Sequence, residues 1–257
     1  MRKPLSNGPA VELSFLGTGD AFANGGRFQS GYLLEAHGYR ILMEAGPTVL
    51  CAMKRMKVDP AELDLILISH LHGDHFGGLP FLILEYLFES PPRRQITVAG
   101  PRHLEERTWR LFHTMFPYNR GDVDRLRRKL NFVVLEPGCD RRVGKVRVEA
   151  IRTPHMRREA SLALKVALEG KTIAFSGDSG WSDDLVTFTA GVDLFLCECT
   201  YFESAHLDFH MNYPQLAAQR DRFAVGRMIL THVGGEVLRR VSEVQIETAT
   251  DGMRVRI

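Results

Sequence analysis

The chain contains few cysteines, no long apolar run and almost no net charge. Its four cysteines form no Cys-x-x-Cys pair, which argues against a disulfide-rich fold and predicts free thiols in a reducing compartment. The longest apolar stretch, residues 79–88, is interrupted by Glu85 and is too short to cross a bilayer, so no membrane partner is expected. A formal net charge of +2 gives no electrostatic reason to expect nucleic acid as a partner.

Signals for targeting, linkers and repeats are also missing. Residues 1–8 lack the apolar core of a signal peptide, so the cytoplasm is the expected location. The 257 residues are 44% hydrophobic and 25% charged, which is typical of a globular protein with a sizeable core. We therefore expect one domain over residues 1–257, built from two halves of about 1–131 and 132–257.

Strand-like and helix-like patterns follow one another in both halves. Short apolar and alternating patterns predict strands over residues 11–16, 31–36, 40–43, 65–69, 95–99, 145–151, 162–168, 172–175, 194–198, 228–230, 245–248 and 253–257. Helical patterns occupy residues 48–56, 76–89, 102–116, 183–190 and 214–223. Two such halves predict two sheets packed face to face with helices outside. The helix over 76–89 is apolar nearly all round, so it should be buried or form the face of a homodimer.

A cluster of metal-binding residue types follows the strand predicted over 65–69. The cluster reads His70-Leu71-His72-Gly73-Asp74-His75. On an extended segment His70 and His72 share a face and could hold one ion. Asp74 and His75 lie beyond Gly73, where the chain can turn, so they could face a second ion. Neutral imidazole and carboxylate suit zinc and several other divalent metals, and this density predicts a metal site rather than surface histidines beside a helix cap.

This cluster matches the HxHxDH motif of the metallo-β-lactamase superfamily, and the chain resembles its ribonuclease Z-like branch. Residues 16–19 (LGTG) resemble the opening motif of that branch, and residues 76–80 (FGGLP) resemble its continuation after the metal motif. The resemblance covers nearly the whole chain. It implies an α/β fold, the four-layer αββα sandwich of the metallo-β-lactamase type, and a metal-dependent hydrolase.

The resemblance also implies further metal ligands, each after a predicted strand. His155 matches the third histidine motif, Asp178 the aspartate that bridges both metals, and His232 the last ligand. The implied ligands form two sets that share Asp178: His70, His72 and His155 for the first ion, and Asp74, His75 and His232 for the second. Zinc is expected, with manganese or iron as alternatives. Two such ions can lower the pKa of a shared water, so a metal-bridging hydroxide is the implied nucleophile, which Asp74 could orient.

His210 precedes the helix predicted over 214–223, in a stretch that resembles a phosphodiesterase motif. In that branch the histidine contacts the scissile phosphate and helps to protonate the leaving group, which suits an imidazole. The alternative is a surface histidine that caps the helix. Glu198, in a Glu-Cys-Thr sequence resembling the Glu-Ala-Thr motif of the branch, could orient His210 through a hydrogen bond. The implied catalytic residues are therefore Asp74, His210 and Glu198.

Two features depart from the ribonuclease Z pattern. Glu44 stands where the family usually has an aspartate, so the support of the metal site could differ. The interval from His155 to Asp178 is short, whereas bacterial ribonuclease Z carries there a long Gly/Pro-rich arm that clamps transfer RNA. Only a strand hairpin is predicted in this interval. RNA is therefore not favoured as a substrate.

Three functions agree with these features. The favoured one is a dinuclear phosphodiesterase acting on a small or nucleotide-like phosphodiester. A hydrolase of carboxylic esters, lactones or thioesters is the alternative, because activated hydroxide also attacks carbonyl groups. The third is a non-catalytic metal-binding module, against which the complete ligand set argues.

Overall fold

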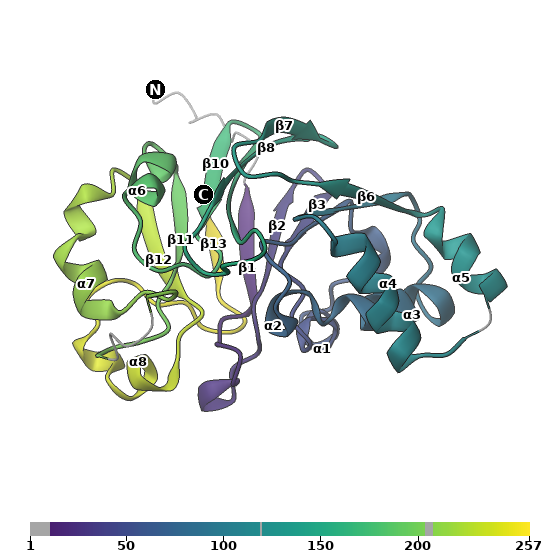
Figure 1. Ribbon diagram of the computed structural model, residues 1–257, viewed down its shortest axis with the longest axis horizontal. Coiled ribbons are helices and arrows are strands. Elements are labelled where there is room, and N and C mark those ends of the chain that lie inside the picture. The colour runs from purple at the N-terminus through teal and green to yellow at the C-terminus, as the bar shows by residue number, and fades with distance from the viewer. Residues whose placement is uncertain (1–10, 119, 204–207) are drawn as a thin grey trace, which may run out of the picture.

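The computed structural model describes residues 11–118, 120–203 and 208–257 (Figure 1). The amino-terminal residues 1–8, on which the expectation about a signal peptide rests, lie outside the described residues. Within the described part, none of the helices combines the length and apolar character needed to cross a membrane. Cys51, Cys139, Cys197 and Cys199 are free thiols.

Two sheets face each other, and helices cover the outer face of each. The first sheet, seven-stranded in the described residues, has the order β13 (Arg254–Arg256), β1 (Glu12–Gly17), β2 (Gly31–Ala36), β3 (Tyr39–Met43), β4 (Leu65–Leu67), β5 (Ile96–Gly100) and β6 (Leu130–Val134). The second, six-stranded, has the order β12 (Arg227–Thr231), β11 (Leu194–Glu198), β10 (Lys171–Phe175), β9 (Leu162–Leu168), β8 (Val146–Arg152) and β7 (Asp140–Val143). The strand β13 belongs to the second half of the chain but pairs with β1 in the first sheet, so the second half contributes a strand to the sheet of the first half.

Helices form the two outer layers. In Figure 1, α1 (Val49–Arg55), α3 (Leu79–Phe88), α4 (Leu104–Met115) and α5 (Arg120–Arg127) lie on one side of the strands. On the other side lie α6 (Asp183–Thr189), α7 (Tyr213–Ala218) and α8 (Gly235–Arg239). The short helix α2 (Gly73–Phe76) and the 3-10 helices η1 (Asn24–Gly26), η2 (Pro60–Glu62), η3 (Arg220–Arg222) and η4 (Val241–Glu243) complete the described elements. The chain therefore has the predicted four-layer αββα architecture.

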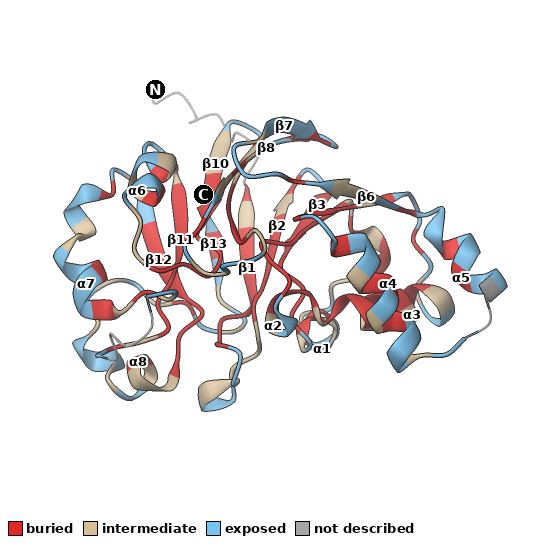
Figure 2. Cartoon of the chain, viewed as in Figure 1, coloured by how far each residue is buried: buried red, intermediate tan, exposed pale blue. Residues whose placement is uncertain are grey.

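Three apolar cores hold these layers together, because successive strand residues point to opposite faces. Leu34 of β2 packs in the core between the two sheets, with Leu164 of the second sheet. Its neighbour Leu33 packs in the core beneath the helices of the first sheet. Phe195 and Leu216 belong to the core between the second sheet and its helices. Figure 2 shows buried residues along the strands and exposed residues on the outer helices.

Three predicted elements differ from the structure. The helix predicted over 214–223 is divided into the α-helix α7, which ends at Ala218, and the 3-10 helix η3. The helix predicted over 76–89 begins only at Leu79, because the backbone at Gly78 packs against the loop after β3: its N–H donates to the carbonyl of Ala45 at 2.7 Å. A side chain at Gly78 would lie 2.3 Å from the carbonyl oxygen of Gly46. The strand predicted over 245–248 is reduced to a single bridge between Thr248 and Leu230.

The apolar character of α3 is explained within the chain. Leu82, Ile83 and Tyr86 are buried in the core that α3 shares with α4 and α5. The helix is therefore covered mainly by its own chain, and the homodimer that it was expected to support stays a prediction.

Candidate metal centre

The seven predicted metal ligands come from loops at the carboxyl ends of strands. His70 and His72 follow β4, His155 follows β8, Asp178 follows β10, and His232 follows β12. Asp74 and His75 lie in α2, directly after the β4 loop. In sheets with this topology the carboxyl ends of parallel strands gather at one edge, where ligands bind. Residues far apart in the chain therefore meet at this edge.

The structure brings all seven residues together in two groups that share Asp178. Within each group, one ligand atom per residue lies within 4.8 Å of the others: His70, His72, His155 and Asp178 in the first group, and Asp74, His75, Asp178 and His232 in the second. The two carboxylate oxygens of Asp178 face different groups. Its Oδ2 lies 3.7 Å from Nε2 of His70, and its Oδ1 lies 3.2 Å from Nε2 of His75.

Three buried polar atoms show that these groups fit metal ions. His70 Nε2, His75 Nε2 and Asp178 Oδ1 are buried, and none has a hydrogen-bond partner within the described residues. Burying a polar atom without a partner is costly. One divalent cation in each group would together satisfy these atoms, and imidazole nitrogen with carboxylate oxygen is a donor set that zinc, manganese and iron accept.

The electrostatics of the first group favour neutral imidazoles. Burial, reinforced by the neighbouring His75, holds the pKa of His70 well below its usual value. Burial also lowers the pKa of His72 and of His155. Burial by itself would raise the pKa of Asp178, but the charges of His232 and His75 outweigh it and hold that pKa well below its usual range. Neutral histidines and an ionised carboxylate are the forms that bind metals.

Glu44, where the sequence departs from the ribonuclease Z pattern, supports ligands of both groups. Its carboxylate is fully buried and accepts a hydrogen bond from Nδ1 of His75. It also accepts from the backbone N–H of Ser69 at 2.7 Å and from the Ser69 hydroxyl at 2.9 Å. The Ser69 hydroxyl lies 3.0 Å from Nδ1 of His70. One carboxylate therefore orients His75 directly and His70 through Ser69.

Replacing Glu44 with glutamine should weaken metal binding about 10- to 100-fold, the usual effect of losing a hydrogen-bond partner of a metal ligand. The amide keeps the size of the side chain but replaces one acceptor oxygen with an NH₂ donor. That donor would face another donor, on Ser69 or on His75, so one hydrogen bond would be lost. Competition with a chromophoric chelator measures the affinity. Glu35→Gln is the control, because Glu35 bonds to Arg40 and not to the centre. Equal affinities in both variants would exclude the supporting role of Glu44.

His210 lies beside the two groups and is held by Glu198. Its Nδ1 lies 2.7 Å from Oε1 of Glu198 and 4.0 Å from Oδ2 of Asp178. Its ring stacks on that of His232 with a centroid separation of 5.6 Å. Burial opposes protonation of His210, but the charge and hydrogen bond of Glu198, together with Asp178, raise its pKa to about 9. The imidazolium form is thus favoured at neutral pH.

Thr200 connects this pair to the second group, and the sequence reasoning assigned it no role. Its hydroxyl lies 2.8 Å from Oε2 of Glu198 and 2.9 Å from Nδ1 of His232. The signal was present in the Glu-Cys-Thr sequence, because residues 198 and 200 point to the same side of an extended segment. Ser69 is a second residue that the sequence reasoning missed, and no motif marks it.

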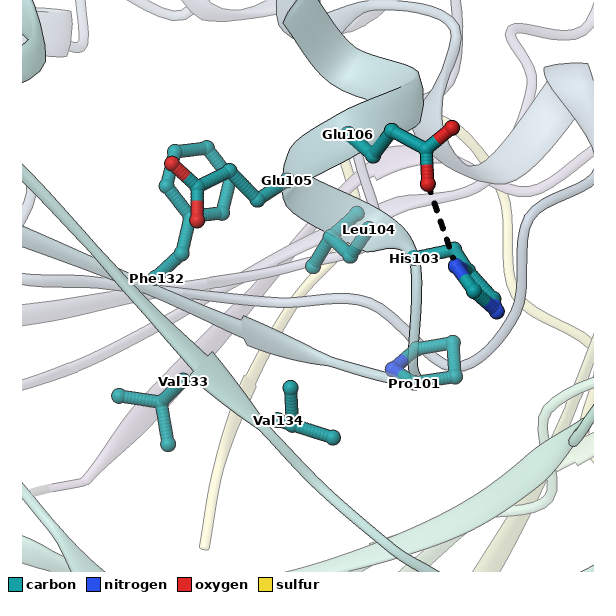
Figure 3. Close-up of a pocket in the computed structure, with 8 residues that line it drawn as sticks. All are labelled: Pro101, His103, Leu104, Glu105, Glu106, Phe132, Val133 and Val134. Atoms are coloured by element: carbon teal, nitrogen blue, oxygen red, sulfur yellow. Dashed lines mark hydrogen bonds and ion pairs between the residues drawn. The ribbon is translucent and has the colours of Figure 1, made fainter.

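A separate surface pocket lies at the ends of β5 and β6 (Figure 3). It has a volume of about 250 Å³ and is lined by Pro101, His103, Leu104, Glu105, Glu106, Phe132, Val133 and Val134. Figure 3 shows its one polar contact among the drawn residues, between His103, which directly precedes α4, and Glu106 in the first turn of that helix. It contains none of the seven candidate ligands, so the metal centre is the better candidate for chemistry.

Comparisons with known proteins agree with this geometry. The chain is 26% identical to ribonuclease Z of Clostridium novyi (strain NT) over 277 residues, covering 87% of this chain and 89% of that protein. Among solved structures, the metallo-β-lactamase fold protein YhfI from Bacillus subtilis superposes with a TM-score of 0.75 at 19% identity, covering 96% of this chain and 100% of YhfI. The chain is therefore a metallo-β-lactamase-fold, metal-dependent hydrolase similar to ribonuclease Z, as its sequence predicted.

A narrower relationship comes from a family model and a further relative. The model of the family described as Anti-Pycsar protein Apyc1 matches residues 11–249. The anti-Pycsar protein Apyc1 of Paenibacillus sp. (strain J14) is 30% identical over 178 residues, covering 69% of this chain and 70% of that protein. Because the family model extends over nearly the whole chain, the chain belongs to the Anti-Pycsar protein Apyc1 family.

Proposed function

We propose that this hydrolase is a dinuclear phosphodiesterase acting on a small or nucleotide-like phosphodiester. The observation that carries the proposal is the position of His210. Its Nδ1 is engaged by Glu198 at 2.7 Å, and its ring lies 4.7 Å from that of His155, between the two ligand groups. No hydrogen bond to a described residue engages its Nε2. That nitrogen is thus free to donate a proton to an oxygen of a phosphodiester held at the centre.

The roles of the residues follow from this arrangement. Two divalent ions, once bound, supply Lewis acidity and a water nucleophile of lowered pKa. Asp74, whose carboxylate lies 3.3 Å from Nε2 of both His75 and His232, orients the attacking water. His210 contacts the phosphate and gives its proton to the leaving oxygen. Glu198 accepts the hydrogen bond from Nδ1 of His210, which stabilises the imidazolium and leaves the Nε2 proton for the leaving oxygen.

The short interval between His155 and Asp178 supports a small substrate. It contains a loop and the antiparallel pair β9 and β10, joined by a tight turn at Glu169 and Gly170. A turn of this size offers no arm to clamp transfer RNA, so RNA is a less suitable substrate. The Paenibacillus relative is named for an anti-Pycsar role, and we propose the same role for this chain. Free thiols keep the cytoplasm as its proposed location.

The proposal predicts a metal-dependent activity with a definite stoichiometry. Protein purified without chelator should contain between one and two ions per chain by elemental analysis, and zinc is the proposed metal, because five of the seven candidate ligands are histidines. Removing the metal should abolish hydrolysis, and adding zinc, manganese or iron back should restore it. Metal content near zero, with no activity regained, would exclude the centre.

A substrate panel tests the reaction type on the same metal-defined protein. The expected result is a kcat/KM for nucleotide phosphodiesters and bis(p-nitrophenyl) phosphate that exceeds the values for lactones, thioesters and carboxylic esters. The blank is the Asp178→Ala variant, which controls for contaminating hydrolases. Preferential hydrolysis of a lactone or thioester would replace the phosphodiesterase proposal with the carbonyl-hydrolase alternative.

A further inference from the structure

A buried hydroxyl group connects a carboxylate to one candidate ligand of the first group. The Ser69 hydroxyl donates a hydrogen bond to Oε2 of Glu44 at 2.9 Å and lies 3.0 Å from Nδ1 of His70. Because a hydroxyl has only one proton and the carboxylate accepts it, Nδ1 of His70 must be the donor of the second bond. Nε2 of His70 is then the unprotonated nitrogen, and it is one of the buried atoms without a hydrogen-bond partner in the described residues. The hydroxyl therefore fixes the tautomer that can bind an ion.

A second buried hydroxyl has the same arrangement in the other half of the chain. Thr200 Oγ1 donates to Oε2 of Glu198 at 2.8 Å and lies 2.9 Å from Nδ1 of His232. The same proton count makes Nδ1 of His232 the donor and leaves its Nε2 unprotonated. That nitrogen faces the second group, 3.3 Å from Oδ2 of Asp74 and 3.5 Å from Oδ1 of Asp178. Both hydroxyls and both carboxylates belong to buried residues, so water does not compete for these bonds.

Two other histidine ligands are held without a hydroxyl group. Nδ1 of His75 donates directly to a carboxylate, and Nδ1 of His155 donates to the backbone carbonyl of Phe209 at 2.9 Å. Dependence on a hydroxyl is therefore found in one histidine of each group, His70 in the first and His232 in the second. The two hydroxyls act on different ligands and bond to different carboxylates, so their effects can be separated.

We infer that Ser69 and Thr200 are positioning residues, each of which sets the affinity of the centre for one metal ion. Ser69 acts on the ion bound by the group of His70, and Thr200 on the ion bound by the group of His232. Without its hydroxyl partner, each ring is free to turn and its Nδ1 proton is left unpaired in a buried site, which weakens metal binding. The inference goes beyond the proposed function, because it concerns the candidate metal centre and holds for any substrate.

Removing each hydroxyl separately should affect one ion only. Ser69→Ala should weaken binding of the first-group ion about 10- to 100-fold and leave the second-group ion unchanged, and Thr200→Val should do the reverse. Stepwise zinc titration against a chromophoric chelator measures both dissociation constants. Anomalous scattering near the zinc absorption edge, from crystals grown at limiting zinc, shows which group has lost its ion. Thr200→Ser keeps the hydroxyl and should restore both affinities.

The control is Thr189→Val, because the Thr189 hydroxyl is also buried but bonds to the carbonyl of Leu185 within α6 at 2.9 Å. This variant should bind both ions as the wild type does. Nitrogen-15 NMR of the zinc-loaded wild type tests the hydrogen bonds without any substitution, so it is decisive even where a variant does not fold. Nδ1 of both His70 and His232 should carry a proton.

Three results would overturn the inference. Equal weakening of both ions in each variant would leave the hydroxyls a general structural role, and unchanged affinities would remove them from the support of the ligands. An unprotonated Nδ1 on His70 or His232 would contradict the direction of the hydrogen bonds. A wild type that binds two ions but hydrolyses no phosphodiester contradicts the proposed function alone, whereas a wild type that binds no ion contradicts the centre and this inference together.

Discussion

Replacing Asp178 with alanine is expected to remove metal binding and hydrolysis together. Each oxygen of this carboxylate faces a different ligand group: Oδ2 lies 3.7 Å from Nε2 of His155, and Oδ1 lies 3.5 Å from Nε2 of His232. The substitution therefore takes a ligand from both groups and leaves five buried or half-buried imidazoles with one fewer negative charge. Losing a residue that only supports a ligand costs about 10- to 100-fold in affinity, so losing this ligand should cost more than about 100-fold.

Elemental analysis and steady-state kinetics on the same preparation measure this effect. Metal content should fall from between one and two ions per chain to near zero, and phosphodiester hydrolysis should fall to the rate measured in buffer without protein. Asp193→Ala is the control, because Asp193 lies in the same half of the chain and bonds to Lys171 and Thr172 away from the centre. Circular dichroism checks that both variants are folded. A variant at position 178 that keeps two ions would disprove the shared-ligand arrangement.

Replacing His210 with alanine should lower kcat roughly 10²- to 10⁴-fold, the usual contribution of general acid catalysis. Metal content should be unchanged, because His210 is a proposed proton donor and not a proposed ligand. The defect should depend on the leaving group. A nitrophenolate departs without much protonation, so the loss should be small for a nitrophenyl ester and large for an alkyl ester.

This leaving-group dependence separates two roles of His210. If His210→Ala lowers kcat equally on both esters, proton donation is excluded, and the role of His210 is electrostatic contact with the phosphate. His103→Ala provides the control, since His103 is an exposed histidine paired with Glu106 at 3.3 Å. Glu198→Gln should reduce kcat in the same leaving-group-dependent way, because Glu198 positions His210. If His210→Ala is fully active on every phosphodiester, the carbonyl-hydrolase alternative becomes the leading function.

Much of the fold could be predicted because strands and helices carry local patterns. The strands β2, β9 and β11 have the bounds that their apolar patterns predict. The predictions failed where contacts distant in sequence decide the outcome. The helix over 76–89 starts late because the loop at residues 45–46 occupies the space beside Gly78. The first residue of α3 therefore depends on a segment some thirty positions earlier in the chain, which a local sequence pattern does not include.

The helix α5 and the strand β7 were not predicted, for a related reason. The sequence of α5 is RGDVDRLR and that of β7 is DRRV, so both are mainly polar. Each segment contains too few apolar residues for a helical or strand periodicity to be recognised. Val123 and Leu126 of α5 are buried only because the helix packs against α3. Val143 is likewise buried because β7 faces the opposite sheet, and the sequence pattern of β7 does not predict that burial.

The sequence by itself determined the metal motif, because His70, His72, Asp74 and His75 lie within six positions and their spacing is a local property. Through the resemblance to the ribonuclease Z-like branch, it also predicted the distant candidate ligands His155, Asp178 and His232. Only the tertiary structure decided how they meet. His72 and His155 are 83 positions apart, and Asp74 and His232 are 158 apart. Their proximity is produced by the packing of two sheets, as is the support that Glu44 gives His75 and the place of Thr200 beside His232. Such contacts depend on long-range packing, which local spacing does not encode.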